Sequence, residues 1–104
     1  MASLRKYTAD LDRLIHEPAR LTIMALLHAV EEADFLYLLR ESGLTKGNLS
    51  SHLAKLEEAS YIQIDKGYVG KIPRTVCRLT GRGREAFKRY RGSLGRIATS
   101  LGLR

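Results

Sequence analysis

The stretch that decides the fold is residues 44–62, which read LTKGNLSSHLAKLEEASYI. Apolar residues recur in it every three or four positions, which is the spacing of one buried face on an α-helix. Thr45 stands just before this pattern and suits the N-cap of a helix. The stretch therefore predicts a helix from about Thr45 to Ala59 with one apolar face and one polar face of short side chains. The apolar positions are Leu49, Leu53, Leu56 and Ala59.

Three further helices are predicted before this one. A short helix over 35–41 is indicated by Asp34, a suitable N-cap, and by Gly43, which would end it. Pro18 suits the first turn of a largely buried helix that runs to about Val30. A terminal helix over 4–15 is predicted by a stripe of apolar residues spaced by three and four. That stripe consists of Leu4, Tyr7, Leu11 and Leu14.

The period changes after the decisive helix. Residues 61–66 alternate between apolar and polar and predict a strand, and residues 75–79 predict a second one. The segment Gly67–Arg74 contains two glycines and a proline and reads as the loop of an antiparallel hairpin. Thr80 then suits the cap of a last helix over 81–101. The chain is thus predicted to be a single domain over 1–104, with its core at about 14–80.

Charge is concentrated in the second half of the chain. The net charge is +7 and the isoelectric point is near 9.9. Four cations and no acid lie between Lys66 and Arg78, and seven cations and one acid lie between Gly81 and Arg104. A small basic domain of this kind often binds a polyanion such as nucleic acid. A merely solvated basic face is the alternative, and charge by itself does not separate the two.

Two short helices followed by a hairpin with a basic loop match a winged helix-turn-helix, a mostly α fold with a small β-hairpin. The major groove of B-DNA admits one α-helix. The second helix of such a pair lies there with its N-terminal residues at the base edges, and the hairpin reaches the backbone or the minor groove. The order of elements therefore predicts a protein that binds double-stranded DNA.

The residues quoted above resemble the recognition helix of the MarR/ArsR-like winged-helix regulators. The run 68–80 (YVGKIPRTVCRLT) and the following Gly83-Arg-Glu85 resemble the wing and last helix of small winged helix DNA-binding domain proteins. The resemblance covers about residues 14–90 and implies a homodimer, operator DNA as partner, and repression or activation of transcription. The pattern usually has Gly where this chain has Ser60, which would cost roughly 1 kcal/mol if that position is left-handed.

Candidate DNA contacts lie on the polar face of the 45–59 helix and in the hairpin loop. Asn pairs bidentately with adenine, and Ser and Lys reach bases or phosphates. Gly47 would let the backbone approach DNA closely, with relaxed capping as the alternative. His52 either contacts phosphate or packs against the preceding helix. The predicted contacts are Thr45, Lys46, Gly47, Asn48, Ser50, Ser51, His52, Lys55, Lys71 and Arg74.

Apolar stripes at both ends of the chain predict a homodimer. The C-terminal stripe steps by three and four in a heptad-like way, and we expect a domain of this size to be too small to cover both stripes. Packing across a two-fold axis would bury them and set two recognition helices about one DNA turn apart. The alternative is that the two terminal helices pack against each other within one chain. The predicted interface is Leu4, Tyr7, Leu11, Leu14, Phe87, Tyr90, Leu94, Ile97 and Leu101.

Other functions find little support in the residues. There is no Ser/His/Asp set, phosphate-binding glycine loop or paired carboxylate motif, so we expect no enzyme. We expect no metal and no cofactor, because the three histidines lie far apart, and no pattern indicates an effector site. Cys77, the only cysteine, is interpreted as a core thiol. We expect a cytoplasmic protein without a membrane partner, since no apolar run is long enough to span a bilayer. A winged helix that binds only proteins, and a nucleic-acid-binding protein without sequence preference, remain the alternatives.

Overall fold

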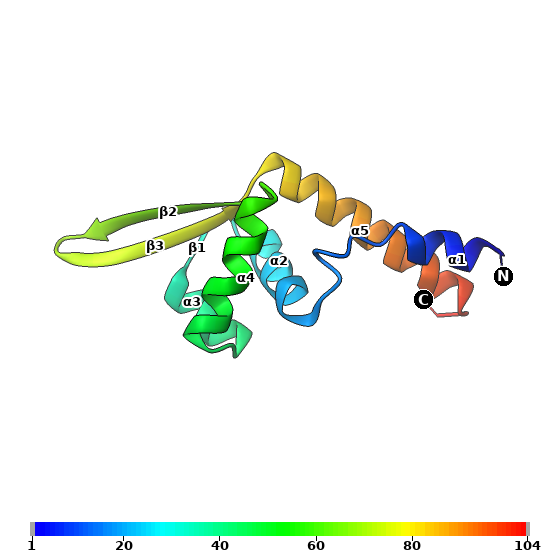
Figure 1. The fold of residues 1–104 in the computed structure, drawn as a ribbon, viewed down its shortest axis with the longest axis horizontal. Helices are drawn as coiled ribbons and strands as arrows, with labels where there is room; N and C mark the ends of the chain where they lie inside the picture. The colour runs from blue at the N-terminus through cyan, green and yellow to red at the C-terminus, as the bar shows by residue number, and fades with distance from the viewer. Residues whose placement is uncertain (1, 104) are drawn as a thin grey trace.

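The computed structural model describes residues 2–103, and its longest dimension is more than twice the others, at 57 × 25 × 21 Å. A long hairpin forms one end of the molecule in Figure 1, three helices gather in the middle, and the two terminal helices form the other end. The elements in chain order are α1 (Ala2–Ala9), α2 (Pro18–Ala29), β1 (Ala33–Asp34), α3 (Phe35–Ser42), α4 (Lys46–Glu58), β2 (Ile62–Val69), β3 (Ile72–Leu79) and α5 (Gly81–Ser100).

The middle of the molecule holds the hydrophobic core, to which α2, α3, α4 and the base of the hairpin contribute. Each large aliphatic side chain buried there stabilises the fold by about 1.5–3 kcal/mol. The core does not end at residue 80 as expected, because α5 adds Ala86, Phe87 and Tyr90 to it. The largest fully buried side chains are Ile15, Ile23, Met24, Leu27, Leu38, Leu49, Leu56, Cys77 and Tyr90.

The predicted helix caps are confirmed. The side chains of Asp34, Thr45 and Thr80 each accept a hydrogen bond from the backbone N–H three residues later, at 2.8, 3.2 and 2.9 Å. Each bond satisfies a donor that the first turn of a helix leaves unpaired. At the other end of α3, Gly43 has φ +70°, as a C-terminal glycine should. These caps fix where α3, α4 and α5 begin.

Helix α4 ends in a Schellman motif centred on Ser60. The Ser60 N–H donates to the Glu57 carbonyl at 2.9 Å, and the Tyr61 N–H donates to the Leu56 carbonyl at 3.0 Å. These two bonds satisfy carbonyls that the last turn leaves free. Ser60 itself has φ 63°, the left-handed conformation that glycine adopts without steric cost. Position 60 is therefore left-handed, and serine in place of the usual glycine carries the expected steric cost there.

The three strands form an antiparallel sheet in the order β1-β3-β2. Strand β1, which was not expected, pairs Ala33 with Cys77 at the edge of β3. The hairpin differs from expectation too: the segment Gly67–Arg74 is mostly strand, paired in register up to Val69 and Ile72. Only Gly70 and Lys71 form the turn, and the φ of +64° at Gly70 fits a II′ turn. The two strands therefore extend as a long narrow ribbon, visible in Figure 1.

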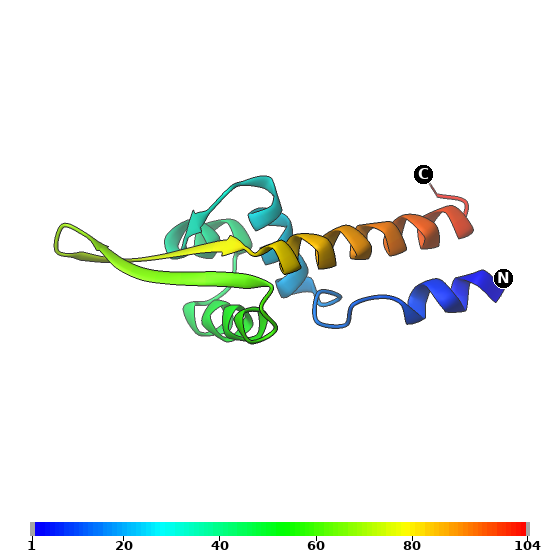
Figure 2. The same ribbon diagram turned by 90° about the horizontal axis from the view of Figure 1, so that it is seen from above.

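Helix α5 crosses the core and continues beyond it, and α1 lies alongside its C-terminal half in Figures 1 and 2. The prediction of a helix over residues 4–15 is wrong about where that helix ends, because α1 stops at Ala9. Asp12 holds the following segment in turns: its Oδ1 accepts from the Leu14 N–H at 2.9 Å, and its Oδ2 accepts from the Tyr61 hydroxyl. Leu14 and its neighbours still reach the core, but from a loop.

The N-terminal turn of α5 packs directly against the backbone of Tyr61, the residue that precedes β2. Gly83 is buried, and a Cβ placed on it would lie 2.0 Å from the Tyr61 carbonyl oxygen. The Thr80 N–H donates to that same oxygen at 3.0 Å. This contact requires glycine at position 83 because any side chain would collide with backbone atoms, which cannot move aside as a side chain would.

Candidate DNA-binding surface

Helix α4 is held to the core by one face only. Leu49, Leu53 and Leu56 are buried, and α2 and β2 contact the helix from the core side. Positions a half-turn away from these leucines on a 3.6-residue period are Gly47, Ser51 and their neighbours. Those residues are exposed, so α4 presents an accessible face whose side chains are short.

The predicted contact residues on α4 lie mostly on its exposed surface. The side chain of Thr45 is occupied in capping, but the residue is exposed at the N-terminus of the helix. Ala54, which the sequence analysis omitted, belongs to the same surface, since it follows Gly47 and Ser51 at helical spacing. The helical spacing of Ala54 from Gly47 and Ser51 is the sequence signal for it. The exposed predicted residues are Thr45, Lys46, Gly47, Asn48, Ser50, Ser51 and Lys55.

His52 is placed differently from the other predicted contacts. Its Nδ1 lies 3.1 Å from a guanidinium nitrogen of Arg20, and its Nε2 lies 4.0 Å from a carboxylate oxygen of Glu17. Only 19% of its side chain is exposed. Glu17 also caps α2, and the hydrogen bond from the Arg20 N–H is the main cause that lowers the pKa of its carboxyl. His52 therefore lies in the junction between α2 and α4, whereas the alternative to a phosphate contact was packing against the preceding helix, which is α3.

The two predicted cations of the hairpin have different surroundings. Lys71 is exposed in the two-residue turn. Arg74 lies on β3, and its Nε is 3.6 Å from the Oδ2 of Asp34, the residue that caps α3. Among residues 2–103, no lysine lies within 4.0 Å of a carboxylate oxygen. Lys71 is therefore free to meet an anion, whereas Arg74 has to leave or share an internal partner.

A groove of about 690 Å³ separates α4 from the hairpin. Ser50 lines it from the helix and Lys66 from β2, which makes Lys66 a basic residue of this surface that the list of expected contacts omitted. Lys66 was one of the four cations noted between Lys66 and Arg78. Its position beside α4 depends on how the hairpin packs, which the sequence pattern did not reveal. The remaining lining residues are Phe35, Leu53, Ala54, Glu57, Ile64 and Thr75.

The predicted dimer residues fall into two groups. Phe87 and Tyr90 are 5% and 2% exposed and belong to the core of their own chain, so their assignment to an interface is wrong. The Tyr90 hydroxyl lies 2.8 Å from the Nδ1 of His16. Leu11, Leu14 and Leu94 are half-buried and pack on the core. Leu4, Tyr7 and Ile97 are half-buried as well but are not among the residues that pack on the core, and Leu101 is 57% exposed.

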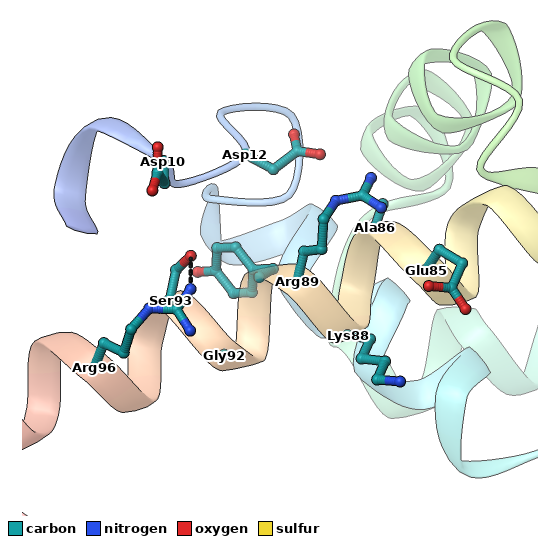
Figure 3. Close-up of a pocket in the computed structure, with 10 residues that line it drawn as sticks. Asp10, Asp12, Glu85, Ala86, Lys88, Arg89, Gly92, Ser93 and Arg96 are labelled. Atoms are coloured by element: carbon teal, nitrogen blue, oxygen red, sulfur yellow. Dashed lines mark hydrogen bonds between the residues drawn. The ribbon is translucent and has the colours of Figure 1, made fainter. Parts of the chain in front are cut away.

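Helices α1 and α5 also contact each other within the chain, as the alternative to the dimer expected. The Arg96 guanidinium carbon lies 5.6 Å from the centre of the Tyr7 ring. A cleft of about 640 Å³ lies beside this contact, between residues 10–12 and α5. Figure 3 shows Asp10 and Asp12 on one side of it and the side chains of α5 on the other. None of its lining residues comes from α4 or the hairpin, so it is separate from the candidate DNA-binding surface.

Cys77 lies in the middle of β3, fully buried, as expected of a core thiol. Burial raises the pKa of this thiol to about 11, and the carboxylates of Glu57 and Asp65 add to the rise.

Within residues 2–103, no group of three or more His, Cys, Asp or Glu residues is arranged to hold a metal. No helix in the same range is long and apolar enough to cross a membrane.

Comparison with known proteins identifies the family of the chain. The family model for the winged helix DNA-binding domain matches residues 19–98. The chain belongs to this family. An uncharacterised protein of Methanocaldococcus jannaschii is 37% identical over 78 residues, which cover 75% of this chain and 85% of that protein. In the winged helix fold of this family, α4 is the second helix of the pair α3–α4, and the β2–β3 hairpin that follows is the wing.

Solved structures agree with this assignment. A transcriptional regulator homologue from Pyrococcus horikoshii superposes with a TM-score of 0.86 at 32% identity, over 99% of this chain and 100% of that one. A MarR-family transcriptional regulator from Enterococcus faecalis shares the fold with a TM-score of 0.71 at 19% identity, over 97% of this chain and 86% of that one. The winged helix fold expected from the sequence is confirmed, and the two solved proteins are a transcriptional regulator homologue and a MarR-family transcriptional regulator.

Proposed function

We propose that this winged helix protein is a transcriptional regulator that binds double-stranded DNA sequence-specifically as a homodimer. Helix α4 enters the major groove with its N-terminal residues at the base edges. The wing lies on the neighbouring backbone or in the minor groove. The terminal helices α1 and α5 join the two copies, which sets the two α4 helices about one DNA turn apart.

The observation that carries the proposal is that α4 has one buried face and one exposed face of short side chains. Three buried leucines fix the helix to the core, while the face turned outward carries glycine, serine and alanine, which leave room for the walls of a groove. Lys46 and Lys55 stand on the same helix and Lys66 stands across the groove, all exposed. Short side chains flanked by cations suit the approach of a helix to base edges between two lines of phosphates.

The dimer is supported by what the terminal helices leave uncovered. Helix α5 runs past the core in Figures 1 and 2, and α1 covers only part of it. Leu101 and Leu103 are 57% and 61% exposed there. Apolar residues gathered at one end of a small molecule favour a partner surface, and a second copy offers the same surface across a two-fold axis.

The test is binding of duplex DNA across a salt series, with a random-sequence duplex and one selected from random DNA by the protein itself. We expect tighter binding to the selected duplex, with affinity falling steeply as salt rises because phosphate contacts release counterions. Asn48→Ala should relax the preference at one base pair, worth about 1–3 kcal/mol, and leave the salt slope unchanged. Gln63→Ala removes an exposed amide from β2 and serves as the matched control.

Two other outcomes would each support a different function. Steep salt dependence with equal affinity for both duplexes would indicate a basic nucleic-acid-binding protein without sequence preference. Absence of binding to either duplex at low salt would contradict DNA binding and favour a winged helix that binds only proteins. An unchanged base preference in Asn48→Ala would remove that residue from the base-reading face.

A further inference from the structure

The tip of the wing is apolar on both of its faces. The last two residue pairs before the turn are Tyr68 with Pro73 and Val69 with Ile72. Side chains alternate between the faces of a strand, so one pair points to each side of the ribbon. Tyr68, Val69 and Ile72 are 75%, 59% and 70% exposed. These four residues, which we call the wing tip, form an apolar point on an otherwise polar hairpin end.

The fold does not account for the wing tip. In the described part of the chain, none of its residues belongs to the core or to the partly buried side chains that pack on the core. The hairpin carries it away from the helices in Figure 1, at the end opposite to α1 and α5. A dimer formed through the terminal helices would leave it uncovered as well. Exposed apolar residues gathered in this way mark an interaction site.

The charge around the wing tip specifies its partner. Lys71 lies in the turn itself. Lys66 lies three residues before Val69 on β2, and Arg74, which pairs with Asp34, lies two residues after Ile72 on β3. Asp65, the first acid along β2, is already bound to Arg78 at 2.5 Å. An apolar point with cations around it complements a groove whose walls are phosphates and whose floor is stacked bases. Proteins that kink DNA have this arrangement, with apolar side chains placed between bases in the minor groove.

We propose that the wing tip is a wedge that enters the minor groove of bound DNA, partly unstacks one base step and kinks the duplex. This inference rests on the proposed function, since it requires that α4 and the wing face DNA. Val69 and Ile72, next to the turn, form the leading edge. A two-stranded ribbon is about 4.8 Å between strands before its side chains are counted, so the groove, about 6 Å wide, has to widen. The widening accompanies a kink toward the major groove.

The wedge also predicts a preference that no hydrogen bond to a base supplies. Pyrimidine–purine steps such as TA unstack easily, whereas A-tracts are stiff. The wild-type protein should therefore favour a TA step at the wing position over an A-tract there, even when the bases under α4 are identical. The preference should depend on the apolar side chains and be independent of Lys71.

The experiment measures the bend by energy transfer between dyes on the two ends of a duplex selected by the wild-type protein. We expect wild-type protein to bring the ends closer and Val69→Ser/Ile72→Ser to leave the duplex straight. The same variant should lose roughly tenfold in affinity for the TA duplex and little for the A-tract duplex. Leu36→Ser is the matched control, because Leu36 is an apolar residue of α3 that is 68% exposed. It should bend DNA as wild type does.

The outcomes separate this inference from the function on which it rests. Wild-type protein that binds the duplex without bending it would overturn the wedge and leave DNA binding intact. A bend that survives in the double variant would overturn it too, and so would a change of the free protein's oligomeric state in that variant, which would make the wing tip a contact between copies. Failure of wild type to bind any duplex would instead overturn the proposed function. Thermal unfolding of each variant checks that the fold is retained, and Ile72→Ala, a milder change, should give a smaller loss of bending.

Discussion

Ser60 has the left-handed backbone conformation that glycine usually adopts. With φ 63° it is the only residue other than glycine with positive φ in the described range 2–103. The left-handed conformation costs a side chain roughly 1 kcal/mol or more, while glycine adds chain entropy to the unfolded state. We expect Ser60→Gly to raise the free energy of unfolding by about 0.5 kcal/mol, measured by urea denaturation.

The control for Ser60→Gly is the same chemical change at a right-handed position. Ser51 is exposed in the middle of α4, where glycine is a poorer helix former than serine by roughly 0.5 kcal/mol. Ser51→Gly should therefore lower stability while Ser60→Gly raises it. Equal and negative effects at both positions would contradict the account of the Schellman motif.

Gly83 is sensitive for the opposite reason, since its φ is ordinary but its surroundings leave no space. We expect Gly83→Ala to destabilise the fold by about 2 kcal/mol or more, because α5 has to move away from the Tyr61 carbonyl. Gly95→Ala lies in the same helix with nothing within 4 Å of the added Cβ, and it should stabilise by about 0.5–1 kcal/mol. Thermal unfolding of the two variants measures the contrast, and similar melting temperatures would contradict the packing described.

The elements that could be predicted from sequence are those whose signals are local. Helices α3 and α4 carry their N-cap and apolar period within a dozen residues, and both begin where expected. The end of α1 could not be predicted, because Asp12 takes its hydrogen bond from Tyr61, which is 49 residues away. Strand β1 has two residues, too few for any period to show.

The wing illustrates a different limit. Gly67 and Pro73 are ordinary loop residues, so their stretch reads as a loop, yet both lie within the paired ribbon. At Pro73 the strand has a neighbour on one side only, since β1 reaches no further along β3 than Val76. Proline, which has no N–H to donate, is tolerated at such an edge. The contacts on α4 were predicted on its exposed face because one helical period fixes both faces of a helix at once.

The wing also yields a prediction about charge. Lys71 makes no ion pair within the described chain, whereas Arg74 is shared with Asp34. Because each phosphate contact contributes about 0.9 to the slope of log affinity against log salt, Lys71→Ala should flatten the slope by about 1. Lys71→Ala with Arg74→Ala should flatten it further and weaken binding to all sequences alike. Lys88→Ala, an exposed cation of α5, is the control; an unchanged slope in both wing variants would show that the wing does not touch phosphate.

At the scale of the whole molecule, the proposed homodimer depends on the terminal helices. Sequence periodicity could not tell Phe87 and Tyr90 from the residues beyond them, because the stripe continues unbroken while the core beneath it ends. Leu94 still packs on the core, so charge placed there would damage the fold as well as an interface. Ile97 and Leu101 lie past it and make cleaner sites for substitution.

We expect Ile97→Glu with Leu101→Glu to convert a dimer into monomers at micromolar concentration, measured by light scattering after gel filtration. Two carboxylates per chain would have to be buried or brought together across the two-fold axis, which is unfavourable. Leu36→Glu places the same charge on an exposed leucine of α3 and should leave the mass unchanged. A dimer that persists in the double variant would remove the terminal helices from the interface.

The shape of the molecule has a practical use. Helix α1 and the C-terminal end of α5 both lie at the end of the molecule away from the wing (Figures 1 and 2), so a peptide joining one copy to the next need not pass α4. Two copies encoded in tandem could then carry different α4 sequences in one polypeptide. Such a tandem should bind a DNA site whose two halves differ in sequence. A fluorescent protein fused at either end of it should lie away from the DNA and allow binding to be followed.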